Sequence, residues 1–372
     1  MRLERLVLRD FRNYEHAEVF FTPTVNVFVG RNAQGKTNLL EAIYLIAMGR
    51  SFRASGEDEL IRHEKENFHL NGDFLGDQDQ RLVIEYGAGS QGRLVRLNGV
   101  PLRRAQELFG RVRVVLFSPD DLQMVKGGPE FRRAFLDLQI AQSSPAYRFV
   151  LYHYQRLLRQ RNEALRRVGE GRTGAAELNV WDEGLIKRGM ELTKRRIDAL
   201  RTLGPLISSY HQRLANGEET IVLRYKLGGR IPAEPGLDIE VYLREEIARR
   251  RAEEISRGLT LVGPHRDDIE LGFPSGHGVR TFGSQGQQRT AALAMKMAAV
   301  DFLRDATAEN PIILLDDVLS EFDRTRQRAL LDLAMEGSQT IITAADEHAV
   351  RLHRPHQVFL VEGGKIATGG MR

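Results

Sequence analysis

The chain has 372 residues, 42% of them hydrophobic, no cysteine and a net charge of +4, which by itself indicates no particular partner. This composition excludes a disordered chain, a disulfide-stapled domain and a cysteine-ligated zinc site, while the length suffices for two domains or one elaborated α/β domain. Because no run approaches 18 apolar residues and the first residues lack the apolar core of a signal peptide, we expect a cytoplasmic protein that spans no membrane.

The first 29 residues predict three strands. Leucines that alternate with charged residues indicate an opening strand, a bend follows at residues 11–14, and further strands are expected near 18–21 and over 25–29. Arg12 and Asn13 lie in the bend. They reach a nucleotide if these strands flank its site, or they are surface residues of a turn.

A nucleotide-binding motif follows. Residues 30–37 read GRNAQGKT, a complete GxxxxGK[ST] loop, and the next segment predicts a helix over 38–48 that stops at Gly49. Glycines let the backbone wrap around phosphate oxygens, while Lys36 reaches the β- and γ-phosphates and Thr37 offers its hydroxyl to Mg²⁺. A glycine-rich turn with a surface lysine is the alternative, but the flanking strand and helix favour the nucleotide site. The predicted nucleotide-binding residues are Arg12, Asn13, Gly30, Arg31, Asn32, Ala33, Gln34, Gly35, Lys36, Thr37 and Asn38.

The middle of the chain changes from strands to helices. Short alternating runs between residues 68 and 97 predict an antiparallel meander, and 112–117 is apolar enough for a central strand. Helices are then expected over 130–141, 147–168 and 177–215, a strand near 220–226 and a charged helix over 239–257. The glycine-rich linker at 169–174 predicts that the two long helices fold back as an antiparallel pair.

Basic charge is concentrated in these helices. Residues 151–214 contain 13 Lys and Arg against 7 Asp and Glu, a local charge of +6, which leaves −2 for the rest of the chain. This pattern is typical of a segment with an anionic partner such as nucleic acid, although solvated arginine-rich helices give the same count. We take Arg195, Arg196 and Arg201 as candidates for DNA contact.

Two clusters near the end of the chain carry chemistry. The segment 282–289, FGSQGQQR, opens a strongly helical run and places Ser284 either as a helix cap or in a second anion-binding device. The segment 311–317, PIILLDD, predicts a buried strand that ends in two carboxylates. Asp316 then holds Mg²⁺ through water and Asp317 orients or deprotonates the attacking water; an acidic turn is the alternative.

Core elements therefore lie at both ends of the chain. We expect an α/β fold whose core lobe comprises residues 1–118 and 262–372, with a helical insertion lobe over 119–261. The loop 262–268, VGPHRDD, returns the chain to the core. Its polar residues face phosphate or a partner subunit, or they form a structural turn.

Together these stretches resemble an ABC-type P-loop ATPase head, and more closely the RecF family. The closer match rests on residues 11–14, 30–41, 263–268, 283–289 and 315–321, which span nearly the whole chain. The resemblance implies an ATPase core with an antiparallel β subdomain and a helical insertion called lobe II. It also implies that ATP joins two subunits face to face, with Ser284, Gly286 and Gln287 acting in trans on the nucleotide of the partner.

The resemblance further implies an ATP- and Mg²⁺-dependent homodimer that binds single- and double-stranded DNA without sequence preference near gaps. With RecO- and RecR-like partners it would promote loading of the recombinase RecA. The chain departs from the general ABC pattern at three places. Asp317 stands where many ABC ATPases have a glutamate, and 343–346 lacks the switch histidine. Residues 118–120 stand where a γ-phosphate-sensing glutamine is usual, and Gln123 is the candidate substitute. These departures predict a slow ATPase that acts as a timer, and the resemblance implies that the activity depends on DNA and that hydrolysis drives release.

Two other functions stay open on the sequence alone. An ATP-binding subunit of a transporter is disfavoured because Lys36 and Ser284 are 248 positions apart and the basic insertion has no obvious membrane-coupling role. A structural head of the SMC or Rad50 type would need a far longer heptad coiled coil than this helix pair.

Overall fold

The computed structural model describes residues 1–76, 80–90, 92–217, 219–229, 231–232, 236–334, 336–346, 350 and 355–372. Two compact units divide the chain. The first contains Met1–Asp121 and Lys296–Arg372, and the second contains Leu122–Met295. None of the described helices is both long and apolar enough to cross a membrane.

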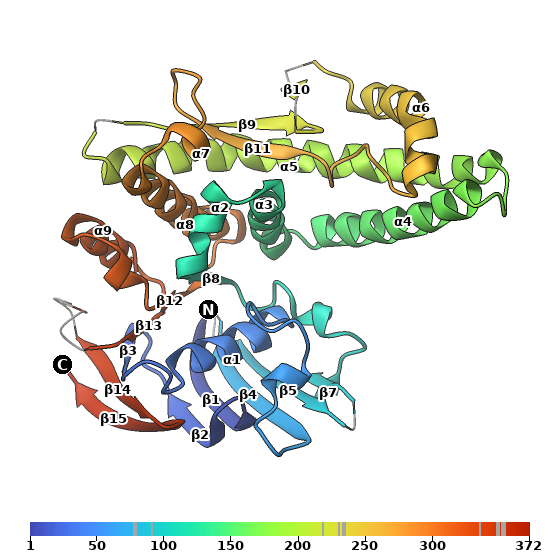
Figure 1. Ribbon diagram of the computed structural model, residues 1–372. Helices are drawn as coiled ribbons and strands as arrows, with labels where there is room; N and C mark the ends of the chain where they lie inside the picture. The colour runs from blue at the N-terminus through green and yellow to red at the C-terminus, as the bar shows by residue number, and fades with distance from the viewer. Residues whose placement is uncertain are drawn as a thin grey trace. The chain divides into compact units, whose positions relative to one another are not determined.

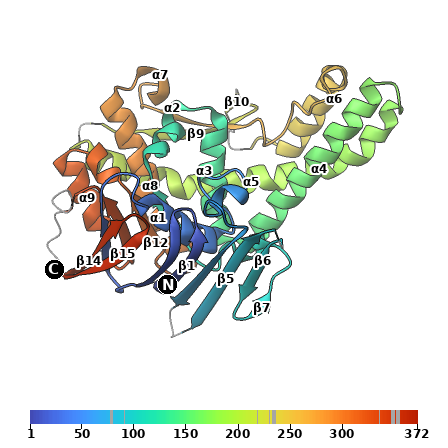
Figure 2. The same ribbon diagram turned by 60° about the horizontal axis from the view of Figure 1, so that its bottom comes forward.

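The first unit contains an antiparallel sheet in the order β2-β1-β4-β5-β6-β7. Its strands are β1 (Arg2–Phe11), β2 (Tyr14–Phe20), β4 (Asn67–Leu75), β5 (Arg81–Gly89), β6 (Leu94–Leu97) and β7 (Val100–Pro101). The predicted meander is confirmed as β4, β5 and β6, which continue the sheet begun by β1, and Figure 2 shows β5 and β6 side by side.

A second six-stranded sheet in this unit has the order β15-β14-β3-β13-β12-β8. Its strands are β3 (Val25–Val29), β8 (Val114–Phe117), β12 (Ile312–Asp316), β13 (Thr340–Ala344), β14 (His356–Glu362) and β15 (Lys365–Met371). All pairs are parallel except β14 with β15. The strand β8 is completely buried, as its apolar sequence predicts, but it lies at the edge of the sheet instead of its centre.

Helix α1 (Lys36–Met48) joins the two sheets. It packs on β1, β4 and β5 of the antiparallel sheet and on β8, β12 and β13 of the parallel sheet. Eleven of its 13 residues are buried, which explains why the helix is apolar around nearly its whole circumference. The helix ends where the sequence predicts, because Gly49 adopts the left-handed conformation, φ 66°.

The second unit is built around long helices (Figure 1). They are α3 (Pro129–Ser143), α4 (Pro145–Gly169), α5 (Leu178–Leu214) and α6 (Ile239–Arg257), preceded by the short α2 (Gln123–Lys126). The start of α4 meets the middle of α5 through Tyr147 and Arg196, while its C-terminal half meets the start of α5 through Arg161 and Asp182. The predicted antiparallel pair is therefore confirmed.

A buried arginine fastens three of these segments. The guanidinium of Arg161 donates to Asp182 on α5 at 2.7 Å, to Glu254 on α6 at 2.6 Å and to the hydroxyl of Thr260 at 2.9 Å. Its side chain is completely buried, so these acceptors compensate for the loss of water.

The chain leaves the second unit later than its sequence pattern indicates. Residues 262–295, which we expected in the core lobe, belong to the second unit. The reason is a three-stranded sheet in which β9 (Val222–Leu227) pairs with both β10 (Ile231–Pro232) and β11 (Asp268–Gly272). This unit also contains α7 (Val279–Phe282), and α8 (Gln285–Thr307) begins in it and ends in the first unit. The remaining helix, α9 (Arg324–Ala334), belongs to the first unit.

Short 3-10 helices fill several connections. They are η1 (Asp58–Leu60), η3 (Ala105–Leu108), η4 (Pro119–Leu122), η5 (Ala175–Glu177) and η6 (Val318–Glu321).

Candidate functional site

Three neighbouring parallel strands end at one edge of the sheet, and each continues into a polar segment. The strand β3 leads into the loop of residues 30–35, β12 ends in Asp316 and Asp317, and β13 carries Thr343 near its end. The order β3-β13-β12 makes these ends adjacent. This edge is the usual ligand site of an open α/β sheet.

Two glycines permit the shape of the loop. Gly35 has φ 120°, a conformation that disfavours any side chain, and a Cβ there would lie 2.8 Å from the amide nitrogen of Asn13. A Cβ on Gly30 would lie 2.3 Å from the backbone oxygen of Val361. The side chain of Asn13 donates to the carbonyl of Gln34 at 2.9 Å, and Tyr14 donates to that of Gly35 at 3.0 Å. Packing against β1, β2 and β14 thus fixes the loop.

Lys36 and Thr37 are the first two residues of α1, and both side chains are held by hydrogen bonds. The Nζ of Lys36 donates to the carbonyls of Gly30 at 2.7 Å and Arg31 at 3.1 Å, which holds the ammonium over the loop. The hydroxyl of Thr37 donates to Oδ1 of Asp316 at 2.8 Å. Two residues 279 positions apart in sequence therefore share one hydrogen bond.

The carboxylate of Asp316 is buried, and this burial raises its pKa above the ordinary value of 3.8. Hydrogen bonds from Thr37 and from the hydroxyl of Thr343, which lies 3.0 Å from Oδ1, act in the opposite direction. A buried carboxylate that accepts only neutral donors is a favourable ligand for a cation, because the cation would stabilise its charged form.

Thr343 is a residue of the site that sequence reasoning did not identify. Besides approaching Asp316, its hydroxyl lies 3.3 Å from the carbonyl of Leu315 and accepts the backbone N–H of Asp317 at 3.0 Å. Asp317 itself has φ 55°, a left-handed conformation that is uncommon for a residue with a side chain. A polar residue near the end of a buried strand beside β12 is the signal that could have indicated Thr343.

The oxygen atoms of Thr37 and Asp316 suit Mg²⁺ better than a metal ion whose ligands all come from the protein. Among the described residues, no group of three or more His, Cys, Asp or Glu side chains is placed to hold a metal ion. Magnesium usually takes one or two protein oxygens and completes its shell with water and substrate phosphates. Thr37 and Asp316 supply that small set.

Arg12 and Asn13 have different surroundings. The guanidinium of Arg12 forms a bidentate pair with the buried carboxylate of Glu41, at 2.9 and 2.8 Å, and donates to the carbonyl of Glu59 at 2.6 Å. Arg12 therefore links α1, through Glu41, to the segment that contains Glu59. Asn13 accepts from Asn38 at 2.8 Å while it supports the loop.

The segment expected to act in trans lies in the second unit. Ser284 and Gln287 form a reciprocal cap at the start of α8, since the hydroxyl of Ser284 accepts from the N–H of Gln287 at 3.2 Å and the side-chain oxygen of Gln287 accepts from the N–H of Ser284 at 2.6 Å. Ser284 and Gly286 are both exposed, as is Phe282 just before them. The cap orders the segment, and its exposure leaves it accessible to a partner.

Gln123, the predicted substitute for a γ-phosphate sensor, begins α2 in the second unit and is exposed. An ion pair of this segment lies two residues earlier. Asp121 pairs with Lys296 at 2.8 Å, and Lys296 also donates to the carbonyl of Leu116 at 2.6 Å. Burial raises the pKa of Asp121.

One of the three predicted DNA contacts is wrong. Arg196 is only 3% exposed and is held by Asp137 through two bonds of 2.8 Å and by the carbonyl of Pro264 at 2.6 Å. Arg195 and Arg201 are exposed by 37% and 68% and pair with acidic residues of the same helix. The helical period of α5 separates them, because consecutive positions 195 and 196 lie on different faces.

The segment 262–268 is a structural connector. The half-buried His265 lies between the hydroxyl of Tyr154 at 2.6 Å and the carbonyl of Thr260 at 3.1 Å, and desolvation lowers its pKa to about 4. Asp268 forms a bidentate pair with Arg132 on α3. His265 and Asp268 therefore have the surroundings expected of a structural turn and not of residues that face phosphate.

Comparisons with known proteins agree with this geometry. The family model described as the RecF/RecN/SMC N-terminal domain matches residues 2–366. A relative from Heliobacterium modesticaldum, named DNA replication and repair protein RecF, is 42% identical over 375 residues and covers 99% of each chain. A solved structure described as the recombination mediator protein RecF-ATP in the RecFOR pathway has a TM-score of 0.91 at 33% identity, covering 99% of this chain and 97% of that one.

A more distant likeness concerns the fold alone. An SMC head solved with the C-winged helix domain of ScpA has a TM-score of 0.59 at 18% identity, covering 99% of this chain and 97% of the other. The expected fold class, an ABC-type P-loop ATPase head, is confirmed.

Proposed function

This chain belongs to the RecF family of DNA replication and repair proteins, and from that premise we propose that it is a recombination mediator that binds ATP and DNA. The observation that carries the proposal is the 2.8 Å hydrogen bond between Thr37 and Asp316, beside an ammonium held over the loop. A loop that only turns a strand into a helix needs neither a buried carboxylate nor a lysine at that place.

In this proposal the phosphates of ATP lie along the N–H groups of residues 30–38, at the N-terminus of α1. Lys36 exchanges a loop carbonyl for phosphate oxygens. Thr37 and Asp316 would hold Mg²⁺, which neutralises phosphate charge when bound. Asp317 orients the attacking water or accepts its proton, and the left-handed backbone at this residue sets the direction of its side chain. The segment 343–346 retains Thr343 as a positioning residue but has no switch histidine.

Hydrolysis is slow and regulatory in this scheme. The side chain of Asp317 is one methylene shorter than the glutamate of many ABC ATPases, so its carboxylate reaches less far toward the attacking water. Gln123 would sense the γ-phosphate from the second unit. Ser284, Gly286 and Gln287 would act on the nucleotide of a second copy of the chain. Ser284 and Gly286 are exposed and therefore accessible to it, whereas Gln287 is half-buried.

We further propose that the ATP-bound homodimer binds single- and double-stranded DNA near gaps in the cytoplasm. There it would act with RecO- and RecR-like proteins to load RecA, and DNA would stimulate its ATPase activity. The surface arginines Arg195 and Arg201 of α5 support binding to DNA. The solved relative is described as part of the RecFOR pathway, which supports the RecO- and RecR-like partners. Neither the transporter subunit nor the SMC-type structural head gains support from a specific feature of the site, since the likeness to the SMC head concerns the fold.

Sedimentation velocity of the purified protein with ATP, with a short DNA duplex and with both tests the proposal. We expect a monomer without ATP, a dimer with ATP, and co-sedimentation of DNA with the dimer. A chain that stays monomeric with ATP and DNA at micromolar concentration would contradict the proposal.

A further inference from the structure

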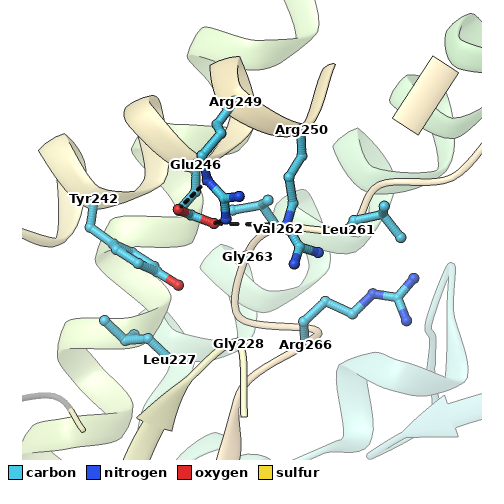
Figure 3. Close-up of a pocket in the computed structure, with 10 residues that line it drawn as sticks. All are labelled: Leu227, Gly228, Tyr242, Glu246, Arg249, Arg250, Leu261, Val262, Gly263 and Arg266. Carbon is cyan, nitrogen blue, oxygen red and sulfur yellow. Dashed lines mark hydrogen bonds and ion pairs between the residues drawn. The ribbon is translucent and has the colours of Figure 1, made fainter. Parts of the chain in front are cut away.

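A cavity of about 330 Å³ lies within the second unit, between α6, the end of β9 and the segment 261–266. We call it the arginine pocket and define it by Leu227, Tyr242, Arg249, Arg250, Leu261 and Arg266 (Figure 3). Its volume falls within the range of roughly 300–1,000 Å³ that is typical of small-molecule sites. Nothing in the ATP site uses these residues.

The charge of the pocket is positive. Three arginines face one acidic lining residue, Glu246, which is held by Arg249 in a bidentate pair of 2.9 and 2.6 Å. Arg250 lies 3.8 Å from the same carboxylate and Arg266 donates to the carbonyl of Thr260 at 3.1 Å. Figure 3 shows that Arg250 comes from α6 and Arg266 from the segment below it. Counted over the lining side chains alone, three guanidinium groups and one carboxylate give a net charge of +2.

The other walls suit an organic group attached to that anion. Leu227 and Leu261 are apolar, and the half-buried ring of Tyr242 points its hydroxyl into the cavity (Figure 3). An inorganic phosphate fills the space of only a few water molecules of about 30 Å³ each, so it would leave much of the cavity empty. A ring can stack on the tyrosine while guanidinium forks bind phosphate oxygens.

The floor of the pocket is fixed by buried bonds. Asp267, 2% exposed, accepts the N–H of Gly228 at 2.8 Å and the hydroxyl of Tyr225 at 2.8 Å. These bonds join the end of β9 to the segment that carries Arg266. The site is thus formed before any ligand arrives, which lowers the entropic cost of binding.

We propose that the arginine pocket is a second nucleotide site, one that takes a nucleoside phosphate. The phosphate lies between Arg250 and Arg266, and the base packs on Tyr242. The ligand is either a free mononucleotide or the phosphorylated terminal nucleotide of a DNA strand. Only the second source depends on the proposed DNA-binding function.

The test uses the full chain and thymidine 5′-monophosphate, which lacks the β- and γ-phosphates that the loop of Lys36 requires. Isothermal titration calorimetry measures its affinity for the parent protein and for the double variant Arg250→Glu/Arg266→Glu. The matched control is Arg244→Glu/Arg257→Glu, which reverses two exposed arginines of α6 outside the cavity. We expect the pocket variant to lose at least about tenfold in affinity and the control to lose none.

A second arm compares hairpin DNA with a 5′-phosphate and with a 5′-hydroxyl. A phosphate preference that disappears in the pocket variant identifies the strand end as the source, whereas monophosphate binding without such a preference identifies a free nucleotide. The milder variant Tyr242→Leu should weaken both ligands if the base stacks there.

The proposal is overturned if neither ligand distinguishes the pocket variant from the control, or if an acidic tripeptide displaces the monophosphate more strongly than other mononucleotides do. ATP-dependent dimerisation is measured on the same variants. Normal dimerisation with lost monophosphate binding separates this site from the ATP site, and failure of dimerisation in the parent protein concerns the proposed function alone.

Discussion

At the scale of single residues, the ATP site is organised by neutral contacts around two charged groups. Lys36 donates to the carbonyls of its own loop, and Asp316 accepts hydroxyl bonds from Thr37 and Thr343. A buried charge with only neutral partners keeps much of its potential for binding an opposite charge. Lys36 is therefore available to bind a phosphate group, and Asp316 is available to bind a cation.

Replacing Lys36 by methionine should weaken ATP binding by about 10- to 100-fold, because one charge-assisted contact to phosphate contributes about 1.5–3 kcal/mol. Equilibrium binding of a fluorescent ATP analogue measures the effect. Lys65→Met, at a lysine 47% exposed beside Asp10, is the matched control. A Lys36→Met protein that binds ATP as its parent does would remove the lysine from the site.

Replacing Asp317 by asparagine should leave Mg·ATP binding intact and slow hydrolysis by about 10²- to 10⁴-fold, because an amide cannot accept a proton from the attacking water. Single-turnover cleavage of labelled ATP measures the rate, and light scattering follows the lifetime of the dimer. We expect slower phosphate release together with a longer-lived dimer. Slow cleavage with normal dimer decay would show that hydrolysis does not time release.

At the scale of elements, helix α5 carries arginines of two kinds, one that is buried and holds the unit together and others that lie on the surface. Arg196 points into the unit and joins Asp137 of α3 to the carbonyl of Pro264, whereas Arg195 and Arg201 remain on the surface. Removing Arg196 would leave the carboxylate of Asp137 without this ion-pair partner. Removing an exposed arginine costs less, because water replaces the lost partner.

Arg196→Ala should lower the free energy of unfolding by about 3–5 kcal/mol, and Arg201→Ala by less than about 1 kcal/mol. Urea unfolding followed by circular dichroism compares the two variants under identical conditions. Equal effects of the two substitutions would contradict the assignment of Arg196 to the interior.

The double variant Arg195→Glu/Arg201→Glu tests the surface of α5 as a path for DNA. If both arginines contact phosphates, the slope of log affinity against log salt should become shallower by about 2, and affinity should fall for all sequences alike. Fluorescence anisotropy with duplexes of two unrelated sequences measures both. Arg244→Glu/Arg257→Glu carries the same charge change on α6 and should leave the slope unchanged.

At the scale of the whole molecule, the chain passes between its two units at residues 121/122 and again at 295/296, within α8. The residues next to these crossings, Asp121 and Lys296, are bonded to each other at 2.8 Å inside the first unit. A helix that starts at the Ser284 cap in one unit therefore ends in the unit that holds the ATP site. One continuous helix therefore links the segment proposed to act in trans to the unit that contains Lys36 and Asp316.

Ser284→Arg should leave ATP binding by the monomer nearly unchanged and prevent ATP-induced dimerisation, because a large cation would occupy the exposed segment that we propose faces the partner. Losing the cap should also lower stability by about 1 kcal/mol. Ser284→Ala loses the same cap without adding bulk and is the matched control. Sedimentation velocity with ATP distinguishes them, and a Ser284→Arg protein that dimerises normally would disprove the trans assignment.

Local sequence patterns were sufficient to predict many of the helices and strands, and they also identified the loop at 30–37 and the carboxylates at the end of β12. The motif at 30–37, the strand before it and the helix after it follow from short-range rules of backbone conformation, as does the strand that ends in Asp316. The boundaries of α6 also agree with its sequence, since Asp238 caps its start and Gly258 ends it with φ 62°.

Short-range patterns were enough to identify features that depend on neighbours in the chain: the loop at 30–37, the two carboxylates at 316–317 and the capped helices. Packing in three dimensions was needed to establish which arginine of α5 is buried, that Thr343 joins the carboxylates, that Arg12 binds Glu41, and that residues 262–295 belong with the helices. These features depend on which face of an element meets another element, and neighbouring residues in the sequence do not specify that face. The bonded partners lie far apart in the chain, 27 positions for Thr343 and Asp316 and 59 for Arg196 and Asp137.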